Sequence, residues 1–325
     1  MEATPKRKYL ITNLVYGDLY LNIFLNHHLR TILDETNLPA ISDKYEIEYL
    51  IFTDEETKPK LERHPNMKRL AAYSEVNIKL FDWHREENSR YSMRYSALLD
   101  VFQDSVRYAL EKGSLLTAWV ADLIVARNFF PKIMERIEKG HGAVFVLPMR
   151  TAFESLGPIL NQSNRALNEK ELFELGYKHL HPLWTACDWN SPRFSRLPFA
   201  LLWTNKNGMM ARSFSITPIV FNPKKEMLQG RGMIDGDVPS KCDNPYWCEN
   251  WTDAPVMGLE PLFCYYPTFA NIRSSVKLTR NWARRSVHPS QFDYLKKRLY
   301  YPDKSTVNMS KIQIIKSDLV VGRIR

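Results

Sequence analysis

The sequence lacks the short motifs that mark several large enzyme classes. It contains no G-x-x-x-x-G-K-[ST] loop, no G-x-G-x-x-G after a strand, no G-x-S-x-G turn and no H-E-x-x-H. These motifs serve phosphate cradling, dinucleotide binding, nucleophile exposure and zinc ligation, respectively. Their absence argues against P-loop NTPases, typical dinucleotide dehydrogenases, α/β hydrolases and the common zinc proteases.

Cysteines and long apolar runs are also scarce. Four cysteines in 325 residues form no C-x-x-C pair, which argues against a disulfide scaffold or a zinc site and favours reduced, mostly buried thiols. The basic and apolar opening stretch is interrupted at Asn13, Asp18 and Asn22, short of the roughly 20 residues that a bilayer span needs. No small-residue cleavage site follows it. We therefore expect a cytoplasmic protein.

The positive charge is concentrated at one end of the chain. The formal net charge is +9. From Arg273 onward there are 13 Lys and Arg but only three Asp, so this segment carries +10 and the rest of the chain −1. Such a segment suits an anionic membrane surface, at the inner face of the membrane, or is simply a solvated face. We do not expect nucleic acid as its partner.

Strand and helix patterns alternate through the first 150 residues. Apolar periodicity predicts strands at 8–17, 45–54, 76–83, 114–122 and 142–148, and helices at 18–35, 55–64, 93–113 and 128–140, with Asp18 available as the first N-cap. This alternation predicts an α/β fold of Rossmann-like type, with a mostly parallel sheet and helices on both faces.

The second half of the chain has a different sequence pattern. A helix is expected over 163–180, and the Pro-, Trp- and Asn-rich stretch that follows reads as short strands and ordered loops, with a hairpin turn at 205–208. A last amphipathic helix is expected over 290–301. We divide the chain into a nucleotide-binding half (1–150), an acceptor-side half (151–270) and a basic, partly helical tail (271–325).

Open parallel sheets bind ligands beyond the carboxyl ends of their strands. That rule selects Tyr16 and Gly17 after the first predicted strand, Asp54 after the second and Asp122 after the fourth. Asp122 is the main metal candidate, because a nucleoside diphosphate is often neutralised by Mn or Mg held on carboxylates. The alternative is a helix N-cap for 128–140.

Several other side chains are candidates by their chemistry. Asp235 and Asp237 flank a glycine, an arrangement that suits sugar hydroxyls, a metal or an ordinary turn. His181 can titrate, and the guanidinium of Arg212 suits the phosphates of a bound donor, with core packing as the alternative for each. Arg94 opens a predicted helix, where a cation opposes the helix dipole unless an anion binds there.

The ordered series of segments resembles uncharacterised bacterial glycosyltransferase-like proteins with the GT-A, nucleotide-diphospho-sugar transferase fold. The resemblance spans roughly residues 8–265 and lies in LVYGDLYLNIFLNHHLRTILDETNLPA, YLIFTDEE, WVAD, HPLWTACDWNSPRFSRLPFALLW, NGMMARSFSITPIVFNP, MIDGDV and WTDAP. It implies a glycosyltransferase of polysaccharide biosynthesis that uses a nucleotide-sugar donor and a glycan or lipid-linked acceptor. A non-catalytic nucleotide-sugar-binding scaffold is the alternative.

The resemblance also implies roles for individual residues. Tyr16, Gly17 and Asp54 would lie near the nucleotide and Arg94 would face the diphosphate. Asp122 takes the place of the metal-binding D-x-D, where this chain has Val-Ala-Asp and so a single carboxylate. The acceptor side would hold His181, Arg212, Asp235, Asp237 and Asp253. One of these three aspartates would act as the general base of an inverting transfer.

Overall fold

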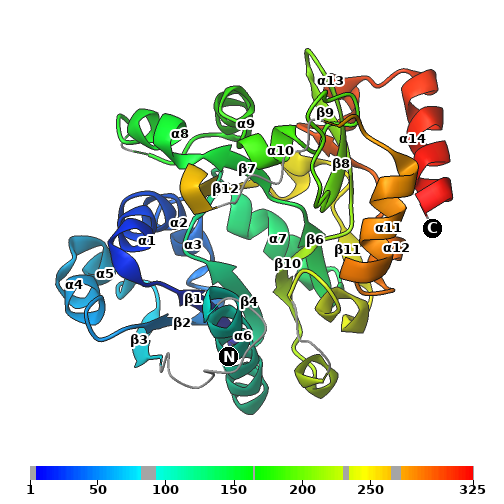
Figure 1. Ribbon diagram of the computed structural model, residues 1–325. Coiled ribbons are helices and arrows are strands. Elements are labelled where there is room, and N and C mark those ends of the chain that lie inside the picture. The colour runs from blue at the N-terminus through cyan, green and yellow to red at the C-terminus, as the bar shows by residue number, and fades with distance from the viewer. Residues whose placement is uncertain (1–4, 82–92, 164, 230–233, 265–271, 325) are drawn as a thin grey trace.

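The computed structural model describes residues 5–81, 93–163, 165–229, 234–264 and 272–324, without the side chains of 93–96 and 264. Its largest element is a seven-stranded sheet in the order β11-β6-β10-β4-β1-β2-β3 (Figure 1). The strands are β1 (Arg7–Leu14), β2 (Tyr45–Thr53), β3 (Glu75–Leu80), β4 (Leu115–Val120), β6 (Ala143–Val146), β10 (Thr217–Phe221) and β11 (Pro245–Trp247). The chain therefore has a mixed α/β fold around a large central sheet.

Most pairings in this sheet are parallel. β3, β2, β1 and β4 run parallel to one another, as do β6 and β11, whereas β10 is antiparallel to both β4 and β6. Residues 9–14 of β1 and 49–53 of β2 are buried without alternation. Continuous burial is what a strand shows when helices cover both faces of its sheet, and the predicted parallel sheet is confirmed.

Helices of very different length connect these strands. The longest is α6 (Met93–Lys112), which packs against β1 and β4, and α7 (Phe129–Glu138) packs against β6. The others in this part are α1 (Gly17–Ile23), α2 (Leu29–Ile32), α3 (Leu38–Ile41), α4 (Lys58–Arg63) and α5 (Pro65–Leu70). No helix among the described residues is long and apolar enough to cross a membrane.

The first helix differs in detail from the sequence prediction. A single helix is predicted over 18–35, but a π-helical segment, η1 (Phe24–His28), separates α1 from α2. Asp18 is not the N-cap. The helix begins one residue earlier, at Gly17, whose φ of +70° is one that glycine adopts without strain.

Two small sheets complete the fold. One consists of β5 (Leu123–Val125), β12 (Val256–Glu260) and β7 (Met149–Ala152), and two residues separate the end of β4 from the start of β5. The other consists of β8 (Ala200–Asn205), β9 (Gly208–Ser213) and β13 (Leu299–Tyr301), of which β8 and β9 form the predicted hairpin. Along the chain, three helices lie between β7 and β8: α8 (Phe153–Leu160), α9 (Glu169–Lys178) and α10 (Pro182–Thr185).

Two helices predicted in the second half are shorter than expected. The helix predicted over 163–180 begins only after Asn168, whose side chain forms a capping box with Glu171. The helix predicted over 290–301 is α12 (Gln291–Tyr294) followed by β13, because Leu299 pairs with Ala211 of β9. Pairing with a distant strand outweighed the local helical periodicity there.

The basic C-terminal segment is folded against the hairpin. Besides α12, its helices are α11 (Val276–Ser286), α13 (Lys304–Val307) and α14 (Lys311–Ile324). α14 and α11 pack together at one end of the molecule (Figure 1). They share a second apolar cluster with the hairpin, which contains Phe194, Leu201, Trp203, Met210, Phe214, Ala283, Leu295, Tyr300, Val307, Met309, Val321 and Ile324.

The hairpin turn offers a test of this packing. Gly208 has φ +148°, and a Cβ there would lie 1.9 Å from the carbonyl oxygen of Tyr301. We expect Gly208→Ala to lower the free energy of unfolding by about 3 kcal/mol or more, since backbone has to move. Gly322→Ala, where a Cβ meets nothing within 4 Å, is the control and should stabilise α14 slightly. Equal midpoints in chemical denaturation for the two variants would contradict this account.

Candidate functional site

Three of the predicted site positions lie at one edge of the central sheet. Gly17, Asp54 and Asp122 follow β1, β2 and β4, and these strands are parallel neighbours. Leu14, near the end of β1, is in register with Phe52 and with Val120. The three carboxyl ends therefore meet at the same edge, which is where open α/β sheets bind nucleotides.

The first two positions are linked through one threonine. The backbone N–H of Gly17 donates to Thr57 Oγ1 at 3.3 Å, and the backbone N–H of Thr57 donates to Asp54 Oδ1 at 2.6 Å. The ring of Tyr16 lies 6.1 Å from that of Tyr20, centroid to centroid. The β1–α1 turn is thus held to the loop after β2, and its backbone geometry is preset.

A network of buried, hydrogen-bonded side chains supports this edge of the sheet. Nδ1 of His28 lies 2.5 Å from the carbonyl oxygen of Leu123 and Nε2 lies 3.0 Å from the Tyr49 hydroxyl, which donates to Asn13 Oδ1 at 2.5 Å. The amide of Asn13 in turn donates to the Val120 carbonyl at 3.2 Å. Burial lowers the pKa of His28 to about 4. These bonds fix the chain on both sides of Asp122.

Asp122 lies beside a second carboxylate and an arginine. Its carbonyl oxygen accepts a 2.8 Å hydrogen bond from the N–H of Leu259, which brings Glu260 next to it. Nη1 of Arg150, on the neighbouring strand β7, lies 3.3 Å from Glu260 Oε2. The guanidinium of Arg150 also lies 4.4 Å from the centroid of the Phe199 ring. A cation and two acids thus share a small volume at the end of β4.

Burial dominates the electrostatics of this cluster. It raises the pKa of Asp122 to about 7, with Glu260 acting in the same direction and Arg150 opposing it. Asp122 and Glu260 are only 9% and 7% exposed. Two nearby acids in a low-dielectric setting resist double ionisation, so Asp122 is poised to change charge near neutral pH.

Two further predicted residues belong to the same neighbourhood. Burial raises the pKa of Asp235, and the charge of Arg150 is the main influence that lowers it. The backbone N–H of His181 donates to the Arg150 carbonyl at 2.9 Å. The ring Nδ1 of His181 accepts from the Leu183 N–H at 3.1 Å, so His181 also caps α10. Burial lowers the pKa of His181, and Glu260 opposes this shift. Arg150 is the charge that these groups have in common.

Other predicted site residues have structural partners. Asp237 is buried and its Oδ2 lies 2.9 Å from the Lys241 ammonium. Asp253 Oδ2 accepts from the Asn250 N–H at 3.1 Å and completes a capping box. Arg94 lies in the first turn of α6, where side chains are outside the described residues. Asp237 and Asp253 are therefore both engaged in contacts that hold the local fold.

Arg212 lies in a different part of the molecule. It is on β9, 3% exposed, and its guanidinium donates to the Lys296 carbonyl at 2.6 Å, to Ser317 Oγ at 3.1 Å and to the carboxylate of Asp318. Its contacts are with the C-terminal segment, and it ties α14 to the hairpin. We therefore leave it out of the proposed donor site.

This placement gives Arg212→Gln a specific expected phenotype. The substitution removes the cation that pairs with Asp318 and breaks a buried charged hydrogen-bond set, so we expect a loss of about 3 kcal/mol in unfolding free energy. Donor binding by the folded fraction should not change. Chemical denaturation and donor titration below the melting temperature check both parts. A weakened donor affinity with unchanged stability would return Arg212 to the donor site.

The donor atoms around Asp122 do not fit a resident divalent cation. Hard cations take several oxygen ligands, whereas Asp122 is a single carboxylate and the adjacent Glu260 is paired with Arg150. Within the described ranges, no group of three or more His, Cys, Asp or Glu side chains is arranged to hold a metal. The positive charge that would face a diphosphate here comes from Arg150.

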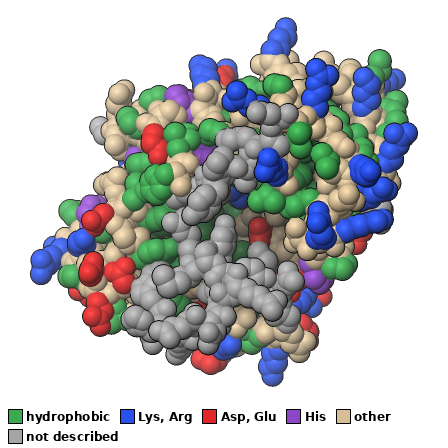
Figure 2. Space-filling view, in the orientation of Figure 1, with side chains coloured by type: hydrophobic (Ala, Val, Ile, Leu, Met, Phe, Trp, Pro, Cys, Tyr) green, Lys and Arg blue, Asp and Glu red, His purple; other side chains and the backbone are tan. Residues whose placement is uncertain are grey.

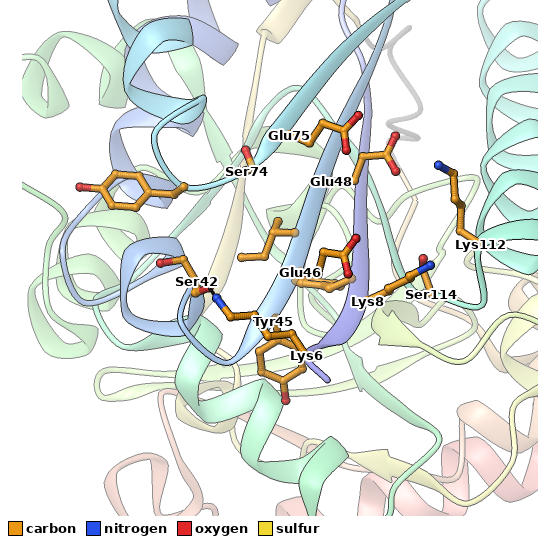
Figure 3. Close-up of a pocket in the computed structure, with 13 residues that line it drawn as sticks. Lys6, Lys8, Ser42, Tyr45, Glu46, Glu48, Ser74, Glu75, Lys112 and Ser114 are labelled. Carbon is orange, nitrogen blue, oxygen red and sulfur yellow. Dashed lines mark hydrogen bonds between the residues drawn. The ribbon is translucent and has the colours of Figure 1, made fainter. Parts of the chain in front are cut away.

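A separate pocket of about 310 Å³ lies at the opposite, amino-terminal edge of the sheet (Figure 3). Both signs of charge line it, and several of its groups are already bonded. Glu48 accepts from Tyr108 at 2.6 Å and from Asn77 at 2.8 Å, and Lys6 donates to the Ser42 carbonyl at 3.0 Å. We place the candidate site at the carboxyl edge instead.

Arg150 and Glu260 were not identified from the sequence. Each is a charged residue inside an otherwise apolar strand, in VLPMRTAF and in VMGLEP. A charged side chain is rarely buried in such a run unless it is paired or functional. That signal could have marked both residues, but only the pairing of β7 with β12 shows that they meet.

Comparison with known proteins yields no family. No protein-family model and no curated protein matches the chain. Among solved structures it is similar to apo mouse xyloside xylosyltransferase 1, with 9% identity over 45% of this chain and 52% of that one and a TM-score of 0.31. It is also similar to a Bacillus anthracis protein described as a glucose-1-phosphate thymidylyltransferase in complex with sucrose, with 13% identity, 44% and 55% coverage and a TM-score of 0.26. The likeness extends over about half of each matched structure.

Proposed function

We propose that this chain is a glycosyltransferase that moves a sugar from a nucleoside-diphosphate sugar to a hydroxyl acceptor. The observation that carries the proposal is the cluster of Asp122, Glu260 and Arg150 at the carboxyl edge of β4, beside the ends of β1 and β2. A cation and paired acids at this edge suit an anionic donor with hydroxyl groups. The sequence resemblance to GT-A proteins supports the same reading.

The donor is proposed to lie across the ends of β1, β2 and β4. Tyr16, the backbone of Gly17 and the carboxylate of Asp54 are proposed to contact the nucleoside, and the bonds of Gly17 and Asp54 to Thr57 hold this part of the edge in place. Arg150 binds the diphosphate, because a planar guanidinium donates two parallel hydrogen bonds to phosphate oxygens. Phe199 against one face of this guanidinium holds its orientation. Ionised Asp122 accepts hydrogen bonds from the donor sugar.

The transfer breaks the bond between the anomeric carbon and the diphosphate oxygen and forms one to the acceptor oxygen. The electron pair of the broken bond leaves on the diphosphate, where the positive charge of Arg150 stabilises it. The acceptor hydroxyl proton passes to a carboxylate, for which we propose Asp235, since burial raises its pKa and so strengthens it as a base. Each of these roles belongs to a residue of this chain.

The first test is donor turnover by the intact chain. We expect one nucleotide sugar from a panel of UDP-, GDP-, CDP- and dTDP-sugars to bind in isothermal titration and to be hydrolysed slowly to sugar and nucleoside diphosphate, with EDTA present. Asp253→Asn, at a cap outside the cluster, is the control and should turn over normally. Binding without turnover of any donor, with or without manganese, would favour the non-catalytic scaffold instead.

A further inference from the structure

One face of α14 combines exposed aliphatic residues with positive charge. Ile312, Ile315 and Leu319 are 65%, 56% and 55% exposed. At 100° per residue these positions fall on one side of the helix. Lys311, Lys316 and Arg323 are exposed on the same side. We call these six residues the α14 face.

The orientation of this face is fixed by the opposite side of the helix. Val321 and Ile324 are buried in the second apolar cluster. Asp318 pairs with Arg212 and, at 2.7 Å, with Arg298. The only acid of α14 is therefore neutralised by the protein itself, and the aliphatic stripe is held toward solvent.

The neighbouring helix also carries exposed apolar and basic residues. α11 packs against α14, and its Leu278 is 50% exposed next to Lys277. Arg284 and Arg285 are exposed further along α11. In the space-filling view, Lys and Arg side chains with hydrophobic ones among them occupy the side where these two helices lie (Figure 2).

We propose that the α14 face, with the adjoining part of α11, docks on an anionic lipid bilayer. Aliphatic side chains that enter the headgroup region beside Lys and Arg that meet lipid phosphates are what an interfacial helix needs. A second copy of this chain is disfavoured as the occupant, because it would bring two segments of charge +10 together. Contact with nucleic acid would use the basic residues but leave the aliphatic stripe unexplained. This inference does not depend on the transfer reaction.

The experiment measures partition of the full-length chain onto sedimented vesicles. Vesicles of pure phosphatidylcholine are compared with vesicles that also contain 30 mol% phosphatidylserine, at low and high salt. One triple variant is Ile312→Ser, Ile315→Ser, Leu319→Ser, and its control changes exposed apolar residues elsewhere, Tyr73→Ser, Leu80→Ser, Leu197→Ser. A second triple variant is Lys311→Gln, Lys316→Gln, Arg323→Gln, and its control changes exposed lysines elsewhere, Lys68→Gln, Lys139→Gln, Lys170→Gln.

We expect the wild-type chain and both controls to bind the anionic vesicles alike and to release them at high salt. Each α14 variant should lose roughly tenfold or more in partition coefficient, with an unchanged circular dichroism spectrum and melting temperature. Equal partition of the serine triple variant and its control overturns the proposal. So does a salt-independent affinity for neutral vesicles, or a dimer in sedimentation equilibrium that the serine variant converts to monomer.

Discussion

Asp122→Asn is expected to lower donor turnover by roughly 10²-fold, because the ionised group that holds the donor sugar in position is lost, and at the same time to stabilise the fold at pH 8. The two effects have one cause. Burial beside Glu260 raises the pKa of Asp122 to about 7, so the ionised form that binds the donor sugar is the form that the folded protein accommodates least well. Asparagine keeps the shape and carries no charge.

The stability effect has a defined pH dependence. An acid whose folded pKa is raised favours the folded state fully below its unfolded pKa of 3.8, and this contribution is lost as pH rises toward 7. The wild-type chain loses it over that window, whereas Asp122→Asn does not titrate at this position. The gain should therefore grow from pH 4 to pH 8 and reach about 1–4 kcal/mol, since one pKa unit corresponds to about 1.4 kcal/mol.

Thermal melts of both proteins from pH 4 to pH 8, together with the pH profile of donor hydrolysis, check this prediction. Wild-type turnover should rise with pH through an apparent pKa near that of Asp122, about 7. A melting-temperature difference that does not change with pH would contradict the burial of the charge. Normal turnover in the variant would remove Asp122 from the site, whatever its stability.

Arg150→Gln is expected to lower turnover by about 10²- to 10³-fold, the range for removal of one group that stabilises developing negative charge, and to weaken donor binding. It should also shift the acid limb of the pH profile of turnover to higher pH. Arg150 lowers the pKa of Asp122 and pairs with Glu260, so without it the two acids oppose each other unscreened and Asp122 ionises only at higher pH.

Arg150→Lys separates charge from geometry. Lysine restores the positive charge but not the paired hydrogen bonds of a guanidinium or its stacking on Phe199. The acid limb should return toward its wild-type position while donor KM stays raised. Initial rates against donor concentration from pH 5 to pH 9 measure both quantities. An unshifted limb in Arg150→Gln, with an unchanged KM, would show that Arg150 does not face Asp122 or the donor.

The local pattern of apolar residues predicts much of the first half of the fold. Continuous apolar runs at β1, β2 and β4, each followed by a helical period, predict a parallel sheet. Because the ends of parallel strands share one edge, the grouping of Gly17, Asp54 and Asp122 follows from the sequence as well. These inferences need only the period of hydrophobicity and the handedness of crossovers, which neighbouring residues carry.

Contacts between distant segments decided the rest. The antiparallel insertion of β10 between β4 and β6, and the pairing of β7 with β12 that brings Arg150 to Glu260, join residues 71 to 110 positions apart, for which no local period exists. Similarly, Arg212 has the chemistry of a phosphate ligand, yet its burial against Asp318 is decided by where α14 packs. Residue type and spacing therefore predicted which edge of the sheet could hold a donor. Tertiary packing determined which charged side chains lie at that edge, because the electrostatic environment of a side chain is set by its neighbours in space.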